Sequence, residues 1–555
     1  MPTRLFDYGL AAASGVLLAL SFPRFGHPAL GWIALAPLLV ALSRSRPQAT
    51  GVLRTPFALG LLTGVIYFSG TLYWITRVMA VYGGLQSWVA VLVNALLIAY
   101  LSLFPALFAV IVRRLVIAHG TTALMAAPLV WVTTELGRTY LLTGFPWVLV
   151  GYSQAPVLPI AQLASVFGVY GLSLLVAASS AALAQFAVDG IVVARAFSAS
   201  AKATAEPPKP WRRRAARVGG PERAALRKRR ARAAYPLAIV LAMILAVAVW
   251  GSRRVARSEW TRTGDPIRVG LVQGNVDQGE KWDPARASAI FQEYLRMTRE
   301  AIAQGAQFVL WPESSTPFFF EEDRPGAEMV RATARNARVT ILLGSDQVDW
   351  RAEGSKRIPD KYYNSAFVVR PDGTTAGAYR KMHLVPFGEY VPLKELLFFA
   401  GPLVEAVGPF SAGIDPTLLP VNGHPTSVAI CYEVVYPNLI RQFVVRGSEL
   451  LTTITNDAWF GQTSAPYQHF AQASMRAIEE GRYLVRSANT GISGIVDPYG
   501  RVVAQTPIFE PAVLVGEARF LREWTFYTRH GDIVGYASAI MTAVALVLSR
   551  RSRRM

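Results

Sequence analysis

Eight apolar runs dominate this chain of 555 residues, and most of them are long enough to cross a lipid bilayer. A transmembrane helix needs about 20 consecutive apolar residues, with a range of about 17 to 25. The chain is also poor in charge, since 17% of its residues are charged, against roughly 25% in an average protein. The runs cover residues 6–22, 28–43, 56–79, 87–112, 120–139, 158–186, 235–250 and 532–549. The sequence therefore predicts a polytopic α-helical membrane domain of about eight spans.

The distribution of positive charge predicts how these spans are oriented. The formal net charge is +20, and most of the excess lies in residues 189–234, with 13 Lys and Arg against three acids, and in the four arginines of the C-terminal tail. Loops on the cytoplasmic side of a membrane carry such an excess. The loops after the second, fourth and sixth runs are basic, whereas those after the odd-numbered runs hold few cations. We therefore expect both termini and a flexible basic loop over 187–234 in the cytoplasm, and no nucleic-acid partner.

The long segment between the seventh and eighth runs has a different pattern and is expected on the outer face of the membrane. Short β-type runs such as "PIRVGLVQGN" and "SVAICYE" alternate in it with helical stretches such as 286–304 and 465–480. This alternation predicts an α/β domain with a layered sheet. We therefore divide the chain into a membrane domain over 1–250, an outer α/β domain over 251–531, and a last span with a basic tail over 532–555.

Three reactive side chains follow predicted strands of the outer domain. Glu313 follows "FVLWP", Lys381 lies in "AYRKMHLVPFGEYVP", and Cys431, the only cysteine of the chain, lies in "SVAICYE". Reactive groups tend to gather beyond the carboxyl ends of the strands in an α/β sheet. A carboxylate can take the proton of a thiol, and a fixed ammonium can stabilise an oxyanion. The three residues therefore predict acyl transfer through a thioester on the cysteine.

The motifs "WPES", "YRKMHLVPFGEYVP", "ICYE" and "TNDAWFG" resemble the Glu–Lys–Cys signatures of the nitrilase superfamily. With membrane spans on both sides, nearly the whole chain resembles the bacterial apolipoprotein N-acyltransferase family. The resemblance implies an αββα sandwich for the outer domain. It also implies an enzyme that takes an acyl chain from a phospholipid, commonly phosphatidylethanolamine, and holds it as a cysteine thioester. In this family the chain then passes to the α-amino group of the diacylglyceryl-cysteine of an apolipoprotein, at the periplasmic face of the inner membrane.

The resemblance also assigns expected roles to individual residues. Cys431 is expected to be the nucleophile, Glu313 the general base and acid, and Lys381 the cation that stabilises the oxyanion. The backbone N–H of Tyr432 is the expected second oxyanion donor. The positions expected to support the triad or to surround the substrate are Glu389, Glu433, Trp282, Asn364, Trp459, Phe460 and Glu479.

Ordinary structural explanations compete with several of these assignments. A lone cysteine after a strand is often a small buried hydrophobe. Glu389 and Glu433 could simply pair with nearby cations, and Trp282, Trp459 and Phe460 could be aromatic residues of a core or an interface. These alternatives stay open at the level of single residues, whereas the ordered set of motifs favours the catalytic interpretation.

Further expectations concern the surface of the membrane. Glu135 and Arg138 stand three residues apart at the end of the fifth run, where we expect their side chains to snorkel toward water. The segment "FPWVLVGY" over 145–152 has the composition of a membrane-interface segment. The apolar stretches 316–322 and 393–410 are expected to lie against the membrane surface, and one or more of them to act as a lid.

Other chemistries lack their motifs in this sequence. It holds no Gly-rich phosphate loop, and one Cys and six scattered His make no metal-ligand cluster. Thioester chemistry needs no cofactor, so we expect neither a cofactor nor a metal. Two other functions remain open: a membrane-tethered amidase or nitrilase-type hydrolase, and a transporter or scaffold that only binds lipoproteins. The intact triad and the scarcity of charge within the spans argue against the second.

Overall fold

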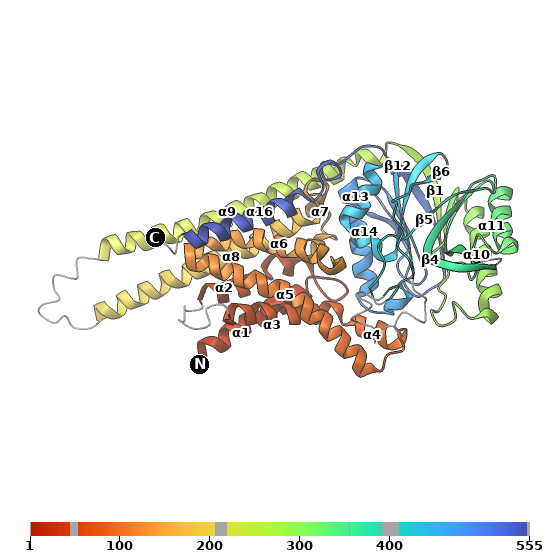
Figure 1. The fold of residues 1–555 in the computed structure, drawn as a ribbon. Helices are drawn as coiled ribbons and strands as arrows, with labels where there is room; N and C mark the ends of the chain where they lie inside the picture. Colours follow the sequence, from red (N-terminus) through yellow and green to blue (C-terminus); the bar gives the residue numbers. More distant parts are fainter. Residues whose placement is uncertain are drawn as a thin grey trace, which may run out of the picture.

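The computed structural model describes residues 2–44, 54–205, 219–353, 356–386, 388–390 and 410–551. Figure 1 shows an elongated molecule with a helical domain at one end and an α/β domain at the other. The helices of the first domain are α1 (Pro2–Ala19), α2 (Ala36–Arg44), α3 (Arg54–Leu72), α4 (Trp74–Val81), α5 (Ser87–His119), α6 (Ala127–Tyr140), α7 (Leu158–Ala161), α8 (Ala164–Ala205), α9 (Gly219–Arg257) and α16 (Ile533–Arg551).

Five helical stretches in the described part of the chain are long and apolar enough to cross a membrane. They are Arg54–Leu72, Ser87–His119, Ala164–Gly190, Ala234–Thr261 and Ile533–Arg550. The other three predicted runs are mainly helical as well: 6–22 on α1, 28–43 on a 3₁₀ turn and α2, and 120–139 on a 3₁₀ turn and α6. The helical membrane domain is therefore confirmed, while the number of spans stays a prediction.

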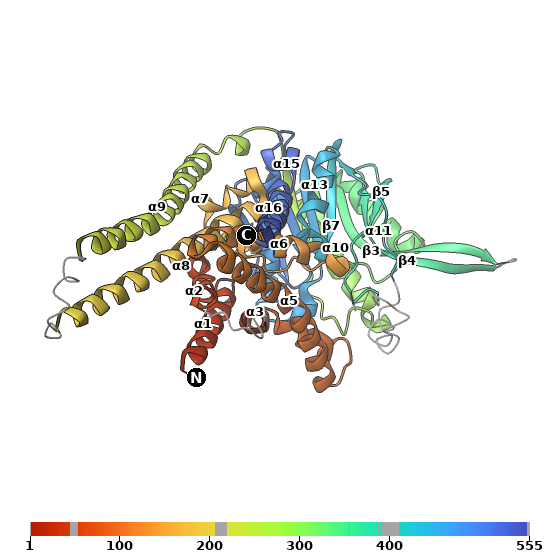
Figure 2. The ribbon, with the colours of Figure 1, turned by 60° about the vertical axis from the view of Figure 1, so that its left-hand side comes forward.

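The described ends of the basic segment 187–234 are helical, where we expected a flexible loop. Helix α8 continues to Ala205 and helix α9 already begins at Gly219, and both extend well beyond the other helices (Figure 2). Alanine, arginine and lysine are strong helix formers, and they dominate both extensions. Their helix propensity explains why the helices do not stop where the apolar residues stop.

In the described part of the α/β domain the strands form two six-stranded sheets. Their orders are β12-β1-β2-β3-β4-β5 and β11-β10-β9-β8-β7-β6. The strands are β1 (Asp265–Gln273), β2 (Phe308–Leu310), β3 (Thr340–Glu353), β4 (Lys356–Val369), β5 (Thr375–Arg380), β6 (Leu419–Val421), β7 (His424–Ile430), β8 (Leu450–Thr455), β9 (Leu484–Ala488), β10 (Gly494–Val496), β11 (Val502–Gln505) and β12 (Ala512–Phe520). The centre of each sheet is parallel, as β1-β2-β3 and as β7-β8-β9.

Helices cover the outer face of each sheet, which confirms the expected αββα sandwich. Helices α10 (Pro284–Ala303) and α11 (Arg324–Ala337) cover the first sheet, and α13 (Pro437–Val445) and α14 (Ala465–Glu480) cover the second (Figure 1). Successive side chains of a strand point to opposite faces. In β2, Phe308 and Leu310 accordingly join the core between the sheets, while Val309 joins the core beneath α10 and α11.

The α/β domain is inserted between two helices of the membrane domain. Helix α9 leads into β1, and β12 leads through the short helix α15 (Phe526–His530) into α16. Strands β1 and β12 pair antiparallel along their whole length, from Asp265 opposite Phe520 to Gln273 opposite Ala512. The chain therefore enters and leaves this domain side by side, and the layer of α13 and α14 faces the helical bundle (Figure 1).

Candidate active site

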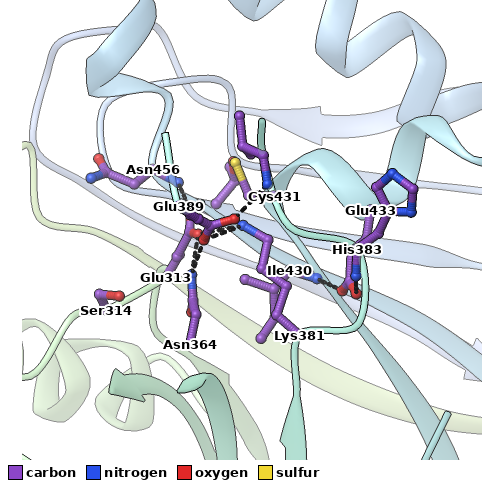
Figure 3. Close-up of polar contacts among 12 residues, drawn as sticks. Glu313, Ser314, Asn364, Lys381, His383, Glu389, Ile430, Cys431, Glu433 and Asn456 are labelled. Atoms are coloured by element: carbon purple, nitrogen blue, oxygen red, sulfur yellow. Dashed lines mark hydrogen bonds and ion pairs between the residues drawn. The ribbon is translucent and has the colours of Figure 1, made fainter. Parts of the chain in front are cut away.

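Glu313, Lys381 and Cys431 each follow a strand, and they come from both sheets. Glu313 follows β2, Lys381 directly follows β5, and Cys431 directly follows β7. All three are buried, with exposed fractions of 6%, 1% and 7%. Figure 3 shows them converging on one place, together with Asn364 and Glu389. The sandwich therefore gathers, in one buried site, residues that are far apart in the sequence.

The carboxylate of Glu313 lies among hydrogen-bond donors. Its Oε1 accepts from Asn364 Nδ2 at 2.7 Å and from Lys381 Nζ at 3.2 Å, and its Oε2 accepts from the backbone N–H of Asn456 at 2.8 Å. Burial raises its pKa, but the ammonium groups of Lys381 and Lys281 and the Asn364 amide outweigh burial, so its pKa lies below the ordinary value. Glu313 is therefore ionised at neutral pH and free to accept a proton.

Lys381 is held between two carboxylates. Its Nζ donates to Glu389 Oε1 at 2.8 Å as well as to Glu313, and Asn364 also donates to Glu389, at 3.0 Å. Burial lowers the pKa of Lys381, but the charges of Glu313 and Glu389 raise it well above its ordinary value. The ammonium group is consequently held in position and stays protonated at neutral pH.

Cys431 begins a short 3₁₀ turn, Cys431–Val435, between β7 and α13. Its φ is +54°, in the left-handed region that is uncommon for a non-glycine residue, so the chain turns sharply at the thiol. Burial and the negative charge of Glu313 raise the pKa of Cys431, although Lys381 opposes them. The resting site therefore pairs a neutral thiol with an ionised carboxylate.

Glu433 ties the strand before the cysteine to the segment after the lysine. Its carboxylate accepts four hydrogen bonds of 2.7 to 3.1 Å, from the Tyr379 hydroxyl and from the backbone N–H groups of Ile430, Met382 and His383. Burial raises its pKa to about 7, against the effect of these donors. Glu433 therefore braces the positions of Lys381 and Cys431 relative to each other, and its four partners are all donors of hydrogen bonds, not the cations of a simple ion pair.

Trp459 and Phe460 contact the membrane domain. The ring of Trp459 packs edge-on against Tyr82 with centroids 5.4 Å apart, and that of Phe460 against Trp74 at 4.9 Å. Trp282, by contrast, is 49% exposed. The structure thus places Trp459 and Phe460 where helix α4 meets the α/β domain, and Trp282 at the surface.

Glu479 lies at a different part of the domain boundary. It is fully buried, accepts a hydrogen bond from the backbone N–H of Val169 in α8 at 2.9 Å, and pairs with Arg476 at 3.0 Å. Burial raises its pKa to about 8. In the part of the chain that the structure describes, no hydrogen bond or ion pair joins Glu479 to Glu313, Lys381 or Cys431.

The expectation that Arg138 and Glu135 snorkel toward water is wrong, because both are buried within the protein. Arg138 donates to the carbonyl oxygens of Trp147 at 2.6 Å and Phe145 at 3.3 Å, and Glu135 accepts from the backbone N–H of Val150 at 2.7 Å. Their partners include backbone groups of the loop that follows α6. These groups need polar partners because they are buried.

The same loop carries Trp147 to the site, so its segment 145–152 is not simply a membrane-interface segment. The Trp147 ring stacks on Tyr432 with centroids 6.3 Å apart, and its Nε1 donates to Gln468 Oε1 of α14 at 2.8 Å. Sequence reasoning missed this role because the contacts of Trp147 lie about 300 residues away along the chain.

The expectation that 316–322 lies on the membrane as a lid is wrong for two of its three phenylalanines, Phe318 and Phe320. Phe320 is fully buried and packs on Phe367 at 5.4 Å, and Phe318 packs edge-on against Phe291 at 5.0 Å. They belong to the core beneath α10 and α11. The other expected lid, 393–410, lies outside the described residues except for Phe410.

A second buried lysine, Lys281, was also missed. Its Nζ donates to the backbone carbonyl of Glu313 at 3.0 Å. Burial lowers the pKa of Lys281, while the charges of Glu313 and Asp346 oppose that effect. Its neighbour Trp282 drew attention through the family resemblance, whereas nothing in the local sequence distinguishes Lys281 from a surface lysine.

Comparisons with known proteins cover most of the chain. Residues 14–182 match the family model described as "Apolipoprotein N-acyltransferase N-terminal domain", and residues 268–523 match "Carbon-nitrogen hydrolase". An apolipoprotein N-acyltransferase of Geobacter metallireducens is 39% identical over 99% of this chain and 96% of its own length. One of Methylococcus capsulatus is 33% identical over 98% and 96%. A solved amidase from Nesterenkonia sp. is 21% identical over 47% of this chain and 93% of its own, with a TM-score of 0.35. The chain belongs to the apolipoprotein N-acyltransferase family.

Proposed function

We propose that this chain transfers an acyl chain from a membrane phospholipid to the α-amino group of an apolipoprotein through a thioester on Cys431. The observation that carries this proposal is the buried grouping of an ionised Glu313, a fixed Lys381 ammonium and a neutral Cys431 thiol beside the membrane domain. Both substrates are held in the bilayer by their acyl chains, since withdrawing each buried CH₂ costs about 0.8 kcal/mol. A membrane-embedded enzyme is therefore needed to meet them.

In the first half-reaction Glu313 accepts the thiol proton as Sγ attacks the ester carbonyl of the phospholipid. The tetrahedral oxyanion is stabilised by Lys381 Nζ and the backbone N–H of Tyr432. Glu313 then returns the proton to the departing alkoxide, which leaves as a lysophospholipid. Sγ retains the acyl chain as a thioester.

In the second half-reaction the α-amino group of the diacylglyceryl-cysteine attacks the thioester carbonyl. Glu313 takes a proton from the amine, the C–S bond breaks, and Glu313 passes the proton to the departing thiolate, so an amide forms and the enzyme returns to its first state. The same oxyanion donors serve both steps. Glu389 and Glu433 hold the triad in place, and Asn364 orients both Glu313 and Glu389.

We assign the aromatic residues near the site to substrate contact. Trp459 and Phe460 lie against α4 of the membrane domain, which suits contact with lipid chains that arrive from the bilayer, and exposed Trp282 suits the rim of the site. Glu479 supports the junction of the two domains instead of the reaction itself.

The chain is an integral membrane protein of the bacterial inner membrane. We further propose that the α/β domain over 251–531 faces the periplasm, that both termini lie in the cytoplasm, and that 1–250 and 532–555 form the membrane part. The concentration of Lys and Arg in 189–234 and in the C-terminal tail supports this orientation. Phosphatidylethanolamine is the proposed acyl donor.

Intact-mass measurement on the purified chain incubated with phosphatidylethanolamine tests the function. The wild type is expected to gain one acyl chain that hydroxylamine removes, and Cys431→Ala none. A diacylglyceryl peptide should then discharge the adduct and become an amide. Discharge that is equally fast without the peptide would support the membrane-tethered hydrolase instead, and an adduct on Cys431→Ala would overturn Cys431 as the nucleophile.

The second buried lysine allows a prediction about pH. Glu313 can act as a base only above its pKa, which the ammonium of Lys281 helps to lower. Lys281→Met should therefore raise the pKa of Glu313 and move the acid limb of the acylation profile to higher pH, while Lys281→Arg should keep it in place. The profile is measured as the rate of adduct formation against pH, with the exposed Lys361→Met as the control. An unmoved acid limb in Lys281→Met would show that Lys281 does not set the ionisation of Glu313.

A further inference from the structure

A buried histidine lies directly behind the nucleophile. His469 of α14 is fully buried, and its Nε2 lies 3.1 Å from the backbone carbonyl oxygen of Cys431. Its Nδ1 lies 3.0 Å from Asp457 Oδ1 and 3.0 Å from a terminal nitrogen of Arg486. No step of the proposed reaction uses this residue.

The partners of the ring determine where its proton is. A carbonyl oxygen can only accept a hydrogen bond, so Nε2 carries a proton and donates it to Cys431. Burial and the charge of Arg486 lower the pKa of His469, although Asp457 opposes them. Nδ1 faces both Asp457 and Arg486, and Nε2 donates to the Cys431 carbonyl whichever of the two Nδ1 bonds.

Asp457 completes a rigid support behind the ring. Arg486 donates to its Oδ2 at 2.9 Å and the Thr455 hydroxyl donates to its Oδ1 at 2.9 Å. All of these side chains are fully buried. The imidazole also packs against Trp147, at 5.4 Å between centroids, and against Phe460 at 5.9 Å. His469 is therefore confined on several sides, and its Nε2–H has one orientation.

The carbonyl that His469 binds belongs to the same peptide group as the N–H of Tyr432. A trans peptide is planar, with C=O and N–H pointing in opposite directions, so fixing one fixes the other. Because Tyr432 lies in the first turn of Cys431–Val435, its N–H has no intrahelical acceptor. A hydrogen bond to the carbonyl also polarises the peptide and strengthens its N–H as a donor.

We propose that His469 is a positioning residue that holds the Cys431–Tyr432 peptide so that the N–H of Tyr432 faces the oxyanion. The inference rests on the proposed function, in which that N–H is an oxyanion donor. His469 acts through the backbone carbonyl of Cys431. The positive φ of Cys431 makes such a support necessary, since this conformation persists only where the surroundings hold it.

Comparing the rates of two reactions of Cys431 distinguishes this positioning role of His469 from a general structural role. Acylation by phosphatidylethanolamine passes through an oxyanion, whereas alkylation by iodoacetamide is a direct displacement at carbon and forms none. Loss of an oxyanion donor lowers the rate constant by about 10²–10³-fold. His469→Leu in the full chain should therefore slow acylation by up to that factor with KM for the phospholipid unchanged, and leave the alkylation rate close to that of the wild type.

His469→Gln, whose amide N–H can still donate to the carbonyl, should recover part of the acylation rate. Gln472→Leu is the matched control, because Gln472 is buried in the same helix and, among the described residues, donates to the Gln468 carbonyl alone, at 3.2 Å. Equal loss of acylation and alkylation in both His469 variants, or no loss of acylation in His469→Leu, would overturn the inference. If the wild type is alkylated but never acylated, the proposed function fails instead.

Discussion

Glu313→Gln is expected to lower the rate of thioester formation by about 10²–10⁴-fold, the usual contribution of a general base. Glutamine matches glutamate in shape but cannot accept a proton. It also fits its surroundings poorly, because the partners of Glu313 on both oxygens are hydrogen-bond donors, from Asn364, Lys381 and the backbone of Asn456. Whichever way the amide turns, its NH₂ group faces at least one of these donors.

The pH dependence of the residual rate gives a second readout for Glu313→Gln. In the wild type the rate should level off above the pKa of Glu313. In the variant the thiol must ionise unaided, and burial raises the pKa of Cys431 well above its ordinary value, so the rate should keep rising with pH. Single-turnover intact-mass kinetics measures both the rate of thioester formation and its pH dependence. Glu321→Gln, at an exposed position of the same segment, is the control. A variant with the wild-type rate and profile would exclude Glu313 as the base.

The fold of the α/β domain and the reactive residues were predictable because they depend on local patterns. Strand and helix periodicity indicated the layers, and Glu313, Lys381 and Cys431 each lie in a short motif beside a strand. The boundaries of the basic segment were less predictable, because helix propensity extends α8 and α9 beyond their apolar parts. Apolar length predicts where a span lies, whereas propensity decides where the helix stops.

The roles of His469 and Arg138 could not be predicted, because they depend on tertiary contacts. His469 meets the Cys431 carbonyl from 38 residues away, and Arg138 is buried because a loop folds back over the end of α6. The error over 316–322 has a similar cause. A run of three phenylalanines has the composition of a membrane anchor, but Phe320 is fully buried while Phe319 is 36% exposed, and composition alone does not show which side chain faces a core.

Lys381→Met is expected to lower both the rate and the stability. Loss of an oxyanion donor lowers the rate by about 10²–10³-fold, and removing one partner of a buried ion pair destabilises a protein by about 3–5 kcal/mol. Lys381 is 1% exposed and bridges Glu313 and Glu389. Without its charge the pKa of Glu313 must rise, because Lys381 helps to lower it. The variant therefore has less ionised Glu313 to act as the base, and it also lacks the cation that stabilises the oxyanion.

A double variant separates these two consequences of losing Lys381. The double variant combines Lys381→Met with Glu389→Gln, which removes a carboxylate that the lysine neutralises. The midpoint temperature of thermal unfolding should therefore return part of the way toward that of the wild type. The acylation rate should stay low, because no ammonium then faces the oxyanion. Recovery of the rate together with the stability would show that Lys381 only neutralises buried charge. Recovery of stability alone would show that its ammonium is needed in the transition state, which is the role that the geometry of the site supports.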